Sequence, residues 1–147
     1  MSNILSESST RIKTGIILII AMLILGYLDS YFLFWLVFGI MLMISISESK
    51  KLFGLKSDSI YIYTSLLWFA AYFYPMPIDL IFIVAIGYAS RLAYKKTLNQ
   101  KLFLPLLYPT ASFLFLLTLY SEFGVMTLLW LLVIVASTDI GAYFVGR

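Results

Sequence analysis

Residues 125–147 read VMTLLWLLVIVASTDIGAYFVGR, an apolar run with a single carboxylate, Asp139, inside it. The run is long enough to form a membrane helix, because about 20 residues cross the hydrocarbon core of a bilayer. An ionised Asp at the centre of such a helix costs roughly 2.5 to 3.5 kcal/mol on insertion scales, so acids there usually face a polar cavity, a cation or a substrate. We therefore expect a membrane helix in this run and chemistry at Asp139.

The composition of the whole chain is that of a membrane protein. Of its 147 residues 63% are hydrophobic and 12% are charged, whereas about 25% are charged in an ordinary soluble domain. Six apolar runs occur, at residues 14–28, 31–46, 60–74, 78–89, 102–120 and 125–145. The sequence predicts an all-α fold, a polytopic membrane helical bundle of about six transmembrane helices, in one transmembrane domain over residues 1–147.

The positions of the charged residues predict the orientation of these helices. All ten Lys and Arg residues lie before the first run or after the second, fourth and sixth. The other three connections hold Asp29, Asp79 and Glu122 and no basic residue. Under the positive-inside rule both termini are cytoplasmic. Several runs are shorter than about 20 residues, but re-entrant hairpins would not produce this alternation, so we expect full crossings.

The reactive side chains limit the chemistry. The chain has no His and no Cys, which excludes Ser-His-Asp and Cys-His triads, disulfides and thiolate metal sites. Carboxylates, hydroxyls, Lys and Arg remain. These groups suit phosphoryl or nucleotidyl transfer, in which positioning and charge neutralisation by Mg²⁺ dominate catalysis. The net charge of +3 is small, and we expect no nucleic-acid partner.

Two further places could carry function. A basic connection after the fourth run holds Arg91, Lys95 and Lys96, and it is either a topology signal or a site that captures the phosphates of a lipid or nucleotide. Glu48 lies just after the second run, at the cytoplasmic end of that span and just before Lys50. It is either a solvated helix end or part of a site.

The surroundings of Asp139 allow two interpretations. Small residues near it let membrane helices approach closely, so Asp139 could serve only an interhelical hydrogen bond. On a helix, Asp139 shares one face with Tyr143 and Gly146. It lies eight residues before Arg147, or about 12 Å from the cytoplasmic boundary, in the inner leaflet. A cavity open to the cytosol could reach a lipid headgroup and a soluble nucleotide there.

The run from Trp130 to Arg147 resembles the Asp-Thr-Gly-Ala-Tyr-Phe-x-Gly-Arg segment of bacterial phosphatidate cytidylyltransferases, or CDP-diacylglycerol synthases. The departure is Ile140, where the family commonly has Thr. Residues 11–15 and Glu48 are also similar. The resemblance implies a multi-pass enzyme of the bacterial inner membrane that, with Mg²⁺, transfers CMP from CTP to phosphatidate. Its products are CDP-diacylglycerol and pyrophosphate.

By this resemblance Asp139 is the catalytic residue and a candidate Mg²⁺ ligand. Tyr143, Arg147, Gly141 and Gly146 would then contact substrate or border the cavity. From their positions in the chain, the further candidates for substrate binding are Glu48, Arg91, Lys95 and Lys96. Family members continue past this motif into a C-terminal signature rich in Ser, Lys, His, Gly and Asp, which supplies the metal-binding acids. That signature is absent here, so we expect the N-terminal and middle part of a longer enzyme, inactive alone.

Two other functions stay open at this stage. A transporter fragment could use Asp139 to bind a proton or a cation. A non-catalytic membrane scaffold could use it only to bond a neighbouring helix. The sequence does not decide between a monomer and a homodimer.

Overall fold

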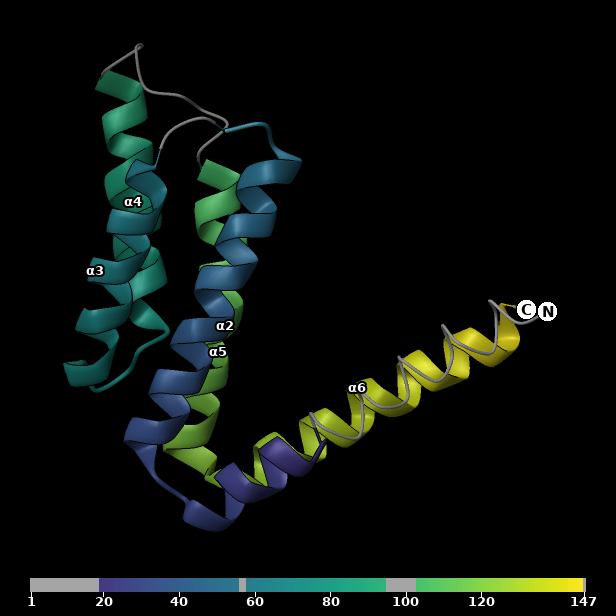
Figure 1. Cartoon of the computed structure of the whole chain (residues 1–147). Coiled ribbons are helices and arrows are strands. Elements are labelled where there is room, and N and C mark those ends of the chain that lie inside the picture. The colour runs from purple at the N-terminus through teal and green to yellow at the C-terminus, as the bar shows by residue number, and fades with distance from the viewer. Residues whose placement is uncertain (1–18, 56–57, 95–102, 147) are drawn as a thin grey trace. The chain divides into compact units, whose positions relative to one another are not determined.

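The computed structural model describes residues 19–55, 58–94 and 103–146, except for the side chains of residues 105, 143 and 144 (Figure 1). Within these residues the regular structure is entirely helical, which confirms the predicted all-α fold. The helices are Ile19–Leu28, α2 (Tyr31–Leu52), α3 (Ser59–Phe73), α4 (Asp79–Tyr94), α5 (Phe103–Phe123) and α6 (Val125–Val145). Each predicted apolar run corresponds to one of these helices.

Polar flanks lengthen several helices beyond their apolar runs, most of all α2 and α4. The second run ends at Ile46, but α2 continues through Lys50 and Lys51 to Leu52, where cations favour the negative end of the helix dipole. In the same way α4 extends past Ala89 to Tyr94. Hydropathy therefore underestimates these two helices at the ends that carry basic residues.

Helix length bears on the predicted crossings. By length and composition three segments in the described part of the chain could cross a membrane: Tyr31–Leu52, Leu106–Phe123 and Val125–Ala142. The 15 residues of α3 and the 16 of α4 span about 23 and 24 Å at 1.5 Å per residue. Since a hydrocarbon core is about 30 Å thick, full crossing by α3 and α4 stays a prediction.

The chain divides into two compact units. The central unit, Tyr31–Gly124, holds α2 to α5, and the terminal unit, residues 1–30 and 125–147, holds the helix Ile19–Leu28 and α6. Each is described by itself below. The prediction of one domain over residues 1–147 stays a prediction.

Helix α5 organises the core of the central unit. It packs against α2, α3 and α4, while α2 also packs against α3. Figure 1 shows α2 and α5 side by side and antiparallel. The large side chains with no exposed surface come from three helices: Phe34, Leu42 and Ile46 from α2, Ile60 from α3, and Leu114 and Leu117 from α5. The α2–α5 contact is thus the best-buried part of the unit.

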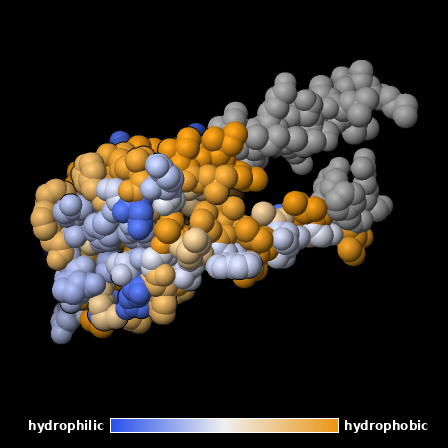
Figure 2. Space-filling model, turned by 90° about the horizontal axis from the view of Figure 1, so that it is seen from below, coloured by the Kyte–Doolittle hydropathy of each residue, from blue (hydrophilic) through white to orange (hydrophobic). Residues whose placement is uncertain are grey.

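The outer surface of the central unit is apolar. Figure 2 shows hydrophobic residues interspersed with polar ones on the face in view. Large exposed hydrophobic side chains occur on each helix of the unit and include Ile40, Ile44, Ile62, Leu66, Ile83, Ile86 and Phe115. Apolar residues both inside and outside are the pattern of a helix bundle in lipid. The structure therefore agrees with a membrane protein.

Two tryptophans join α2 to α3. The indole Nε1 of Trp35 donates to the backbone oxygen of Trp68 over 2.9 Å, and Nε1 of Trp68 donates to the backbone oxygen of Trp35 over 3.1 Å. Gly39 makes this pairing possible, because a Cβ on it would lie 2.4 Å from Nε1 of Trp68. The two hydrogen bonds satisfy both indoles within an apolar contact.

A threonine on α5 holds the beginning of α4. The chain turns at residues 75–78, which include Pro75 and Pro77, because proline lacks the N–H that would continue a helix. Thr118 then accepts a hydrogen bond from the backbone nitrogen of Ile78 over 2.9 Å and donates to the oxygen of Leu114 over 3.0 Å. It thereby satisfies a backbone donor that precedes the first turn of α4.

The end of α2 is fastened to the beginning of α3. Gly54 has a positive φ of 63°, and its nitrogen and that of Leu55 donate back to the oxygens of Lys51 and Lys50, as in a Schellman helix end. The ammonium of Lys50 pairs with Asp58 and lies 5.2 Å from the ring centre of Tyr61. These contacts hold the chain on both sides of residues 56–57, at the end of α2 and at the beginning of α3.

Candidate functional site

Asp139 lies in the second half of α6, and its side chain is exposed within the structure. The hydroxyl of its neighbour Thr138 donates to the oxygen of Ile134, one turn earlier in the same helix, over 2.8 Å. Among the described residues, no group of three or more Asp, Glu, His or Cys side chains could hold a metal ion. Asp139 thus offers a single carboxylate, and its catalytic role stays a prediction.

The other predicted residues of this run are only partly described. The side chain of Tyr143 and all of Arg147 lie outside the described residues. A Cβ on Gly141 would meet nothing within 4 Å, and one on Gly146 would lie 3.1 Å from the oxygen of Ala142 in the same helix. The close helix approach predicted at these two glycines stays a prediction.

A close approach in the terminal unit occurs at a glycine that the sequence analysis did not single out. A Cβ on Gly26 would lie 3.2 Å from Cγ2 of Val125 and 3.8 Å from Cδ1 of Leu129. The helix Ile19–Leu28 therefore contacts the first turns of α6. A glycine within an apolar run is the only sequence signal for this contact, and small residues are common where membrane helices pack.

Glu48 lines a pocket of about 480 Å³ between α2 and α5, which we call the Glu48 pocket. Its polar side chains are those of Ser45, Glu48, Ser49, Tyr108 and Ser112. On α2 the serines and Glu48 lie at i, i+3 and i+4, so they share one helix face. From α5, Ser112 donates to the oxygen of Tyr108 over 3.1 Å.

The Glu48 pocket gathers several polar side chains within a lining that is mostly apolar. Pro109 lines it and stands inside α5, where a proline lacks the N–H that would bond the carbonyl four residues earlier. One carboxylate, three serine hydroxyls and a phenol can bind a cation or a hydroxylated group through hydrogen bonds. Glu48 was predicted from its position, whereas the serines and Pro109 were missed. The spacing of Ser45, Glu48 and Ser49 could have indicated that the two serines share a helix face with Glu48.

Arg91 lies in the last turn of α4, is exposed, and does not line the Glu48 pocket. Lys95 and Lys96 lie outside the described residues. The structure therefore does not bring Arg91 and Glu48 into one pocket.

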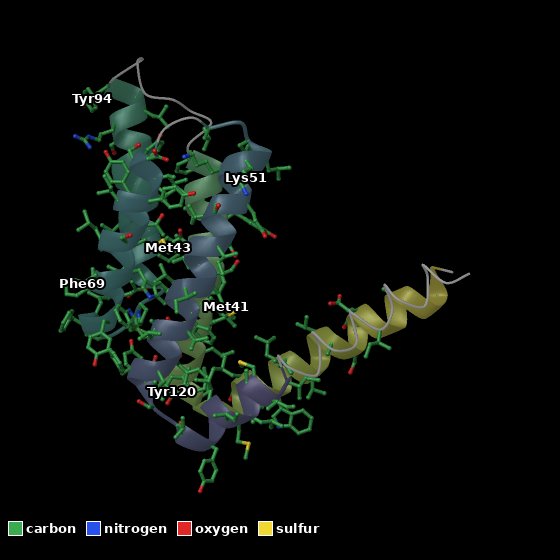
Figure 3. All side chains as sticks on the ribbon, viewed as in Figure 1. Met41, Met43, Lys51, Phe69, Tyr94 and Tyr120 are labelled. Atoms are coloured by element: carbon green, nitrogen blue, oxygen red, sulfur yellow. The ribbon has the colours of Figure 1, made fainter. Side chains whose placement is uncertain are left out.

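The ends of the central unit differ in charge. Figure 3 shows Lys51 and Tyr94, which close α2 and α4, at one end and Tyr120 near the other. Arg91 lies in the last turn of α4, at the end marked by Lys51 and Tyr94, whereas Asp79 begins α4 and Glu122 lies in the last turn of α5. The described basic residues of this unit thus gather at the end that holds Glu48.

Comparisons with known proteins give the same family as the resemblance of the Asp139–Arg147 run. A model of the cytidylyltransferase family matches residues 9–147. Two proteins named phosphatidate cytidylyltransferase, from two strains of Helicobacter pylori, are 38% and 36% identical to the chain over 148 residues. These alignments cover 100% of this chain and 56% of each relative, so the chain spans about half the length of the curated relatives it matches. No solved structure matches the chain. The chain belongs to the cytidylyltransferase family.

Proposed function

We propose that this chain takes part in the transfer of a cytidylyl group from CTP to phosphatidate, which yields CDP-diacylglycerol and pyrophosphate in the inner membrane of a bacterium. The similarity of the entire chain to two phosphatidate cytidylyltransferases carries this proposal. The membrane character of the helices supports it, because phosphatidate is a lipid and its phosphate lies at the membrane surface.

The reaction is a displacement at phosphorus. A phosphate oxygen of phosphatidate bonds to the α-phosphorus of CTP, and the bond from that phosphorus to the bridging oxygen of pyrophosphate breaks. Such reactions depend on positioning and on neutralisation of the developing charge. Mg²⁺ would supply that neutralisation. The described residues do not fit a complete magnesium site, since they offer Asp139 without further ligands gathered around it.

We further propose that both termini are cytoplasmic. The gathering of Lys50, Lys51 and Arg91 at one end of the central unit supports this orientation, since basic residues mark the cytoplasmic side. The Glu48 pocket then opens near the cytosol, where CTP is found. By the predicted topology, Asp139 also lies toward the cytoplasmic end of its own helix, eight residues before Arg147.

The test is a chimera in which this chain replaces the matching part of a Helicobacter relative. Membranes containing it are assayed for CTP-dependent conversion of labelled phosphatidate to CDP-diacylglycerol. Asp139→Asn should lower the rate about 10²-fold or more, the effect typical of a lost electrostatic contact to a transition state.

Glu122→Gln is the matched control, because this exposed carboxylate ends α5 on the predicted outer side. Its rate should equal that of the unchanged chimera. Full activity of the Asp139 variant would contradict the proposed site. Loss of proton flux in liposomes on the same substitution would instead favour a transporter.

A further inference from the structure

A second depression in the central unit lies between α2 and α3, and we call it the α2–α3 groove. Its volume is about 670 Å³, which is in the range of small-molecule sites. The α2 wall includes Gly39, Ile40 and Met43, and the α3 wall includes Ser65 and Phe69. Figure 3 shows Met43 on α2 and Phe69 on α3. The Glu48 pocket lies elsewhere, between α2 and α5.

Both walls of the groove change from apolar to polar in the same direction. On α2 the lining begins at Trp35 and reaches Ser47, and Lys50 and Lys51 follow in the last turn. On α3 the lining goes from Phe69 back to Tyr61. A ligand that fits this groove is therefore apolar along its length and polar at one end.

The length of the groove matches one leaflet. From Trp35 to Ser47 the helix rises about 18 Å at 1.5 Å per residue. One leaflet contributes half of a hydrocarbon core of about 30 Å, so an extended acyl chain has a similar length. The groove runs along α2 and α3, and thus roughly along the direction that a lipid chain takes.

The floor of the groove has no free indole donor. Trp35 and Trp68 line it, but both indole nitrogens already donate to backbone oxygens across the two helices. Gly39 adds no side chain between them. The floor can therefore contact a hydrocarbon chain without leaving either of these indole N–H groups unsatisfied.

The polar end of the groove, which we call its cationic end, lies near Lys50 and Lys51 at the end of α2, with Asp58 paired to Lys50. Lys50 lies over the ring of Tyr61, itself a lining residue, and pairs with Asp58. Lys51 follows and is exposed. Cations at this position attract the phosphate of an anionic lipid.

We propose that the α2–α3 groove binds one anionic phospholipid, with an acyl chain between Ile40 and Phe69 and the phosphate beside Lys51. Binding here does not depend on cytidylyl transfer. The occupant is a lipid of the cytoplasmic leaflet, because the cationic end of the groove is the end predicted to face the cytosol.

The experiment uses the chain reconstituted in vesicles with a phosphatidylglycerol probe that carries a photoreactive diazirine in one acyl chain. After illumination, labelled peptides are identified by mass spectrometry. Label should concentrate on the segments that hold Met43 and Phe69. Ser65→Trp should lower this labelling about fivefold or more, because an indole fills the groove and leaves no room for the chain.

Leu66→Trp is the matched control, since Leu66 is exposed on the same helix and lies outside the groove lining; its labelling should stay unchanged. Ser47→Trp fills the groove from the α2 wall, so it should reproduce the loss if Ser65→Trp does not fold. Equal labelling of the filling variants and the control would overturn the proposal. A second result would also overturn it: the unchanged chain takes up no label and forms a dimer, and the filling variants abolish that dimer. In that case a second copy of the chain would occupy the groove.

The headgroup is tested with a phosphatidylcholine probe of the same acyl chain. It should label the groove several-fold less than the phosphatidylglycerol probe, and Lys51→Gln should reduce that difference, because the attraction depends on the cation. Equal labelling by the two probes in the unchanged chain would overturn the anionic part of the proposal.

Discussion

Single atoms decide how closely α2 and α3 approach. The two indole hydrogen bonds between Trp35 and Trp68 have donor–acceptor distances of 2.9 and 3.1 Å, and they form only because Gly39 has no Cβ in the space of the Trp68 ring. Hydropathy does not distinguish this glycine from the others in the chain. Its importance follows from which side chain lies opposite, and that side chain belongs to another helix.

Gly39→Ala should therefore destabilise the protein. The new methyl group would lie 2.4 Å from Nε1 of Trp68, and overpacking of this kind costs about 1–3 kcal/mol. The free energy of unfolding in mixed detergent micelles, followed by tryptophan fluorescence, measures the effect.

Gly87→Ala is the control for this substitution. A Cβ on Gly87 meets nothing within 4 Å, and alanine is a better helix former than glycine by about 0.5–1 kcal/mol. The Gly87 variant should be as stable as the unchanged chain or more so. Equal stability of both variants would contradict the proposed role of Gly39.

At the scale of the elements, the helices were predictable and their ends were not. The apolar run 31–46 predicts α2, but α2 ends at Leu52 because a Schellman end forms at Gly54, with a positive φ of 63°. Glu48 thereby becomes part of the helix rather than of a connection, and this places it on one face with Ser45. A local pattern predicts a helix, whereas its end depends on hydrogen bonds that the pattern does not encode.

The beginning of α4 also depends on another element. Thr118→Val should destabilise the central unit by about 1–3 kcal/mol, because it leaves the partly buried donor of Ile78 without its acceptor. Thr138→Val is the matched control, since its exposed hydroxyl bonds only the oxygen of Ile134 in its own helix. Circular dichroism during titration with a denaturing detergent measures both. A loss of stability no larger for Thr118→Val than for Thr138→Val would argue against this interhelical hydrogen bond.

At the scale of the whole molecule, charge sets the predicted orientation. The chain contains no Cys, so single-cysteine variants report on individual positions without background. Lys51→Cys should react with a membrane-impermeant maleimide only after spheroplasts are permeabilised, because its end of the central unit is predicted to be cytoplasmic.

Glu122→Cys tests the opposite end. Glu122 is exposed in the last turn of α5, and its thiol should react with the same maleimide in intact spheroplasts. Labelling of the two positions from the same side would contradict the predicted topology, and exchanged labelling would place both termini outside.

The candidate site was only partly predictable, because its residues come from different helices. Asp139 and Glu48 were found from their positions along the chain, because a carboxylate in or beside an apolar run is costly and therefore conspicuous. The residues that complete the Glu48 pocket, Tyr108 and Ser112, come from α5. No pattern within either helix indicates that these two faces meet.

The sequence by itself determined that the chain is helical, belongs in a membrane, and carries the Asp139–Arg147 run of its family, because hydropathy, charge and a short motif act locally. Only the tertiary structure decided that α5 packs on α2, that Gly39 accommodates Trp68, and that the α2–α3 groove exists. The reason is physical: lipid tails are as apolar as Leu, so hydropathy is equally satisfied by a lipid or a helix on any apolar face. The choice between them depends on the fit of side chains that lie far apart in the sequence.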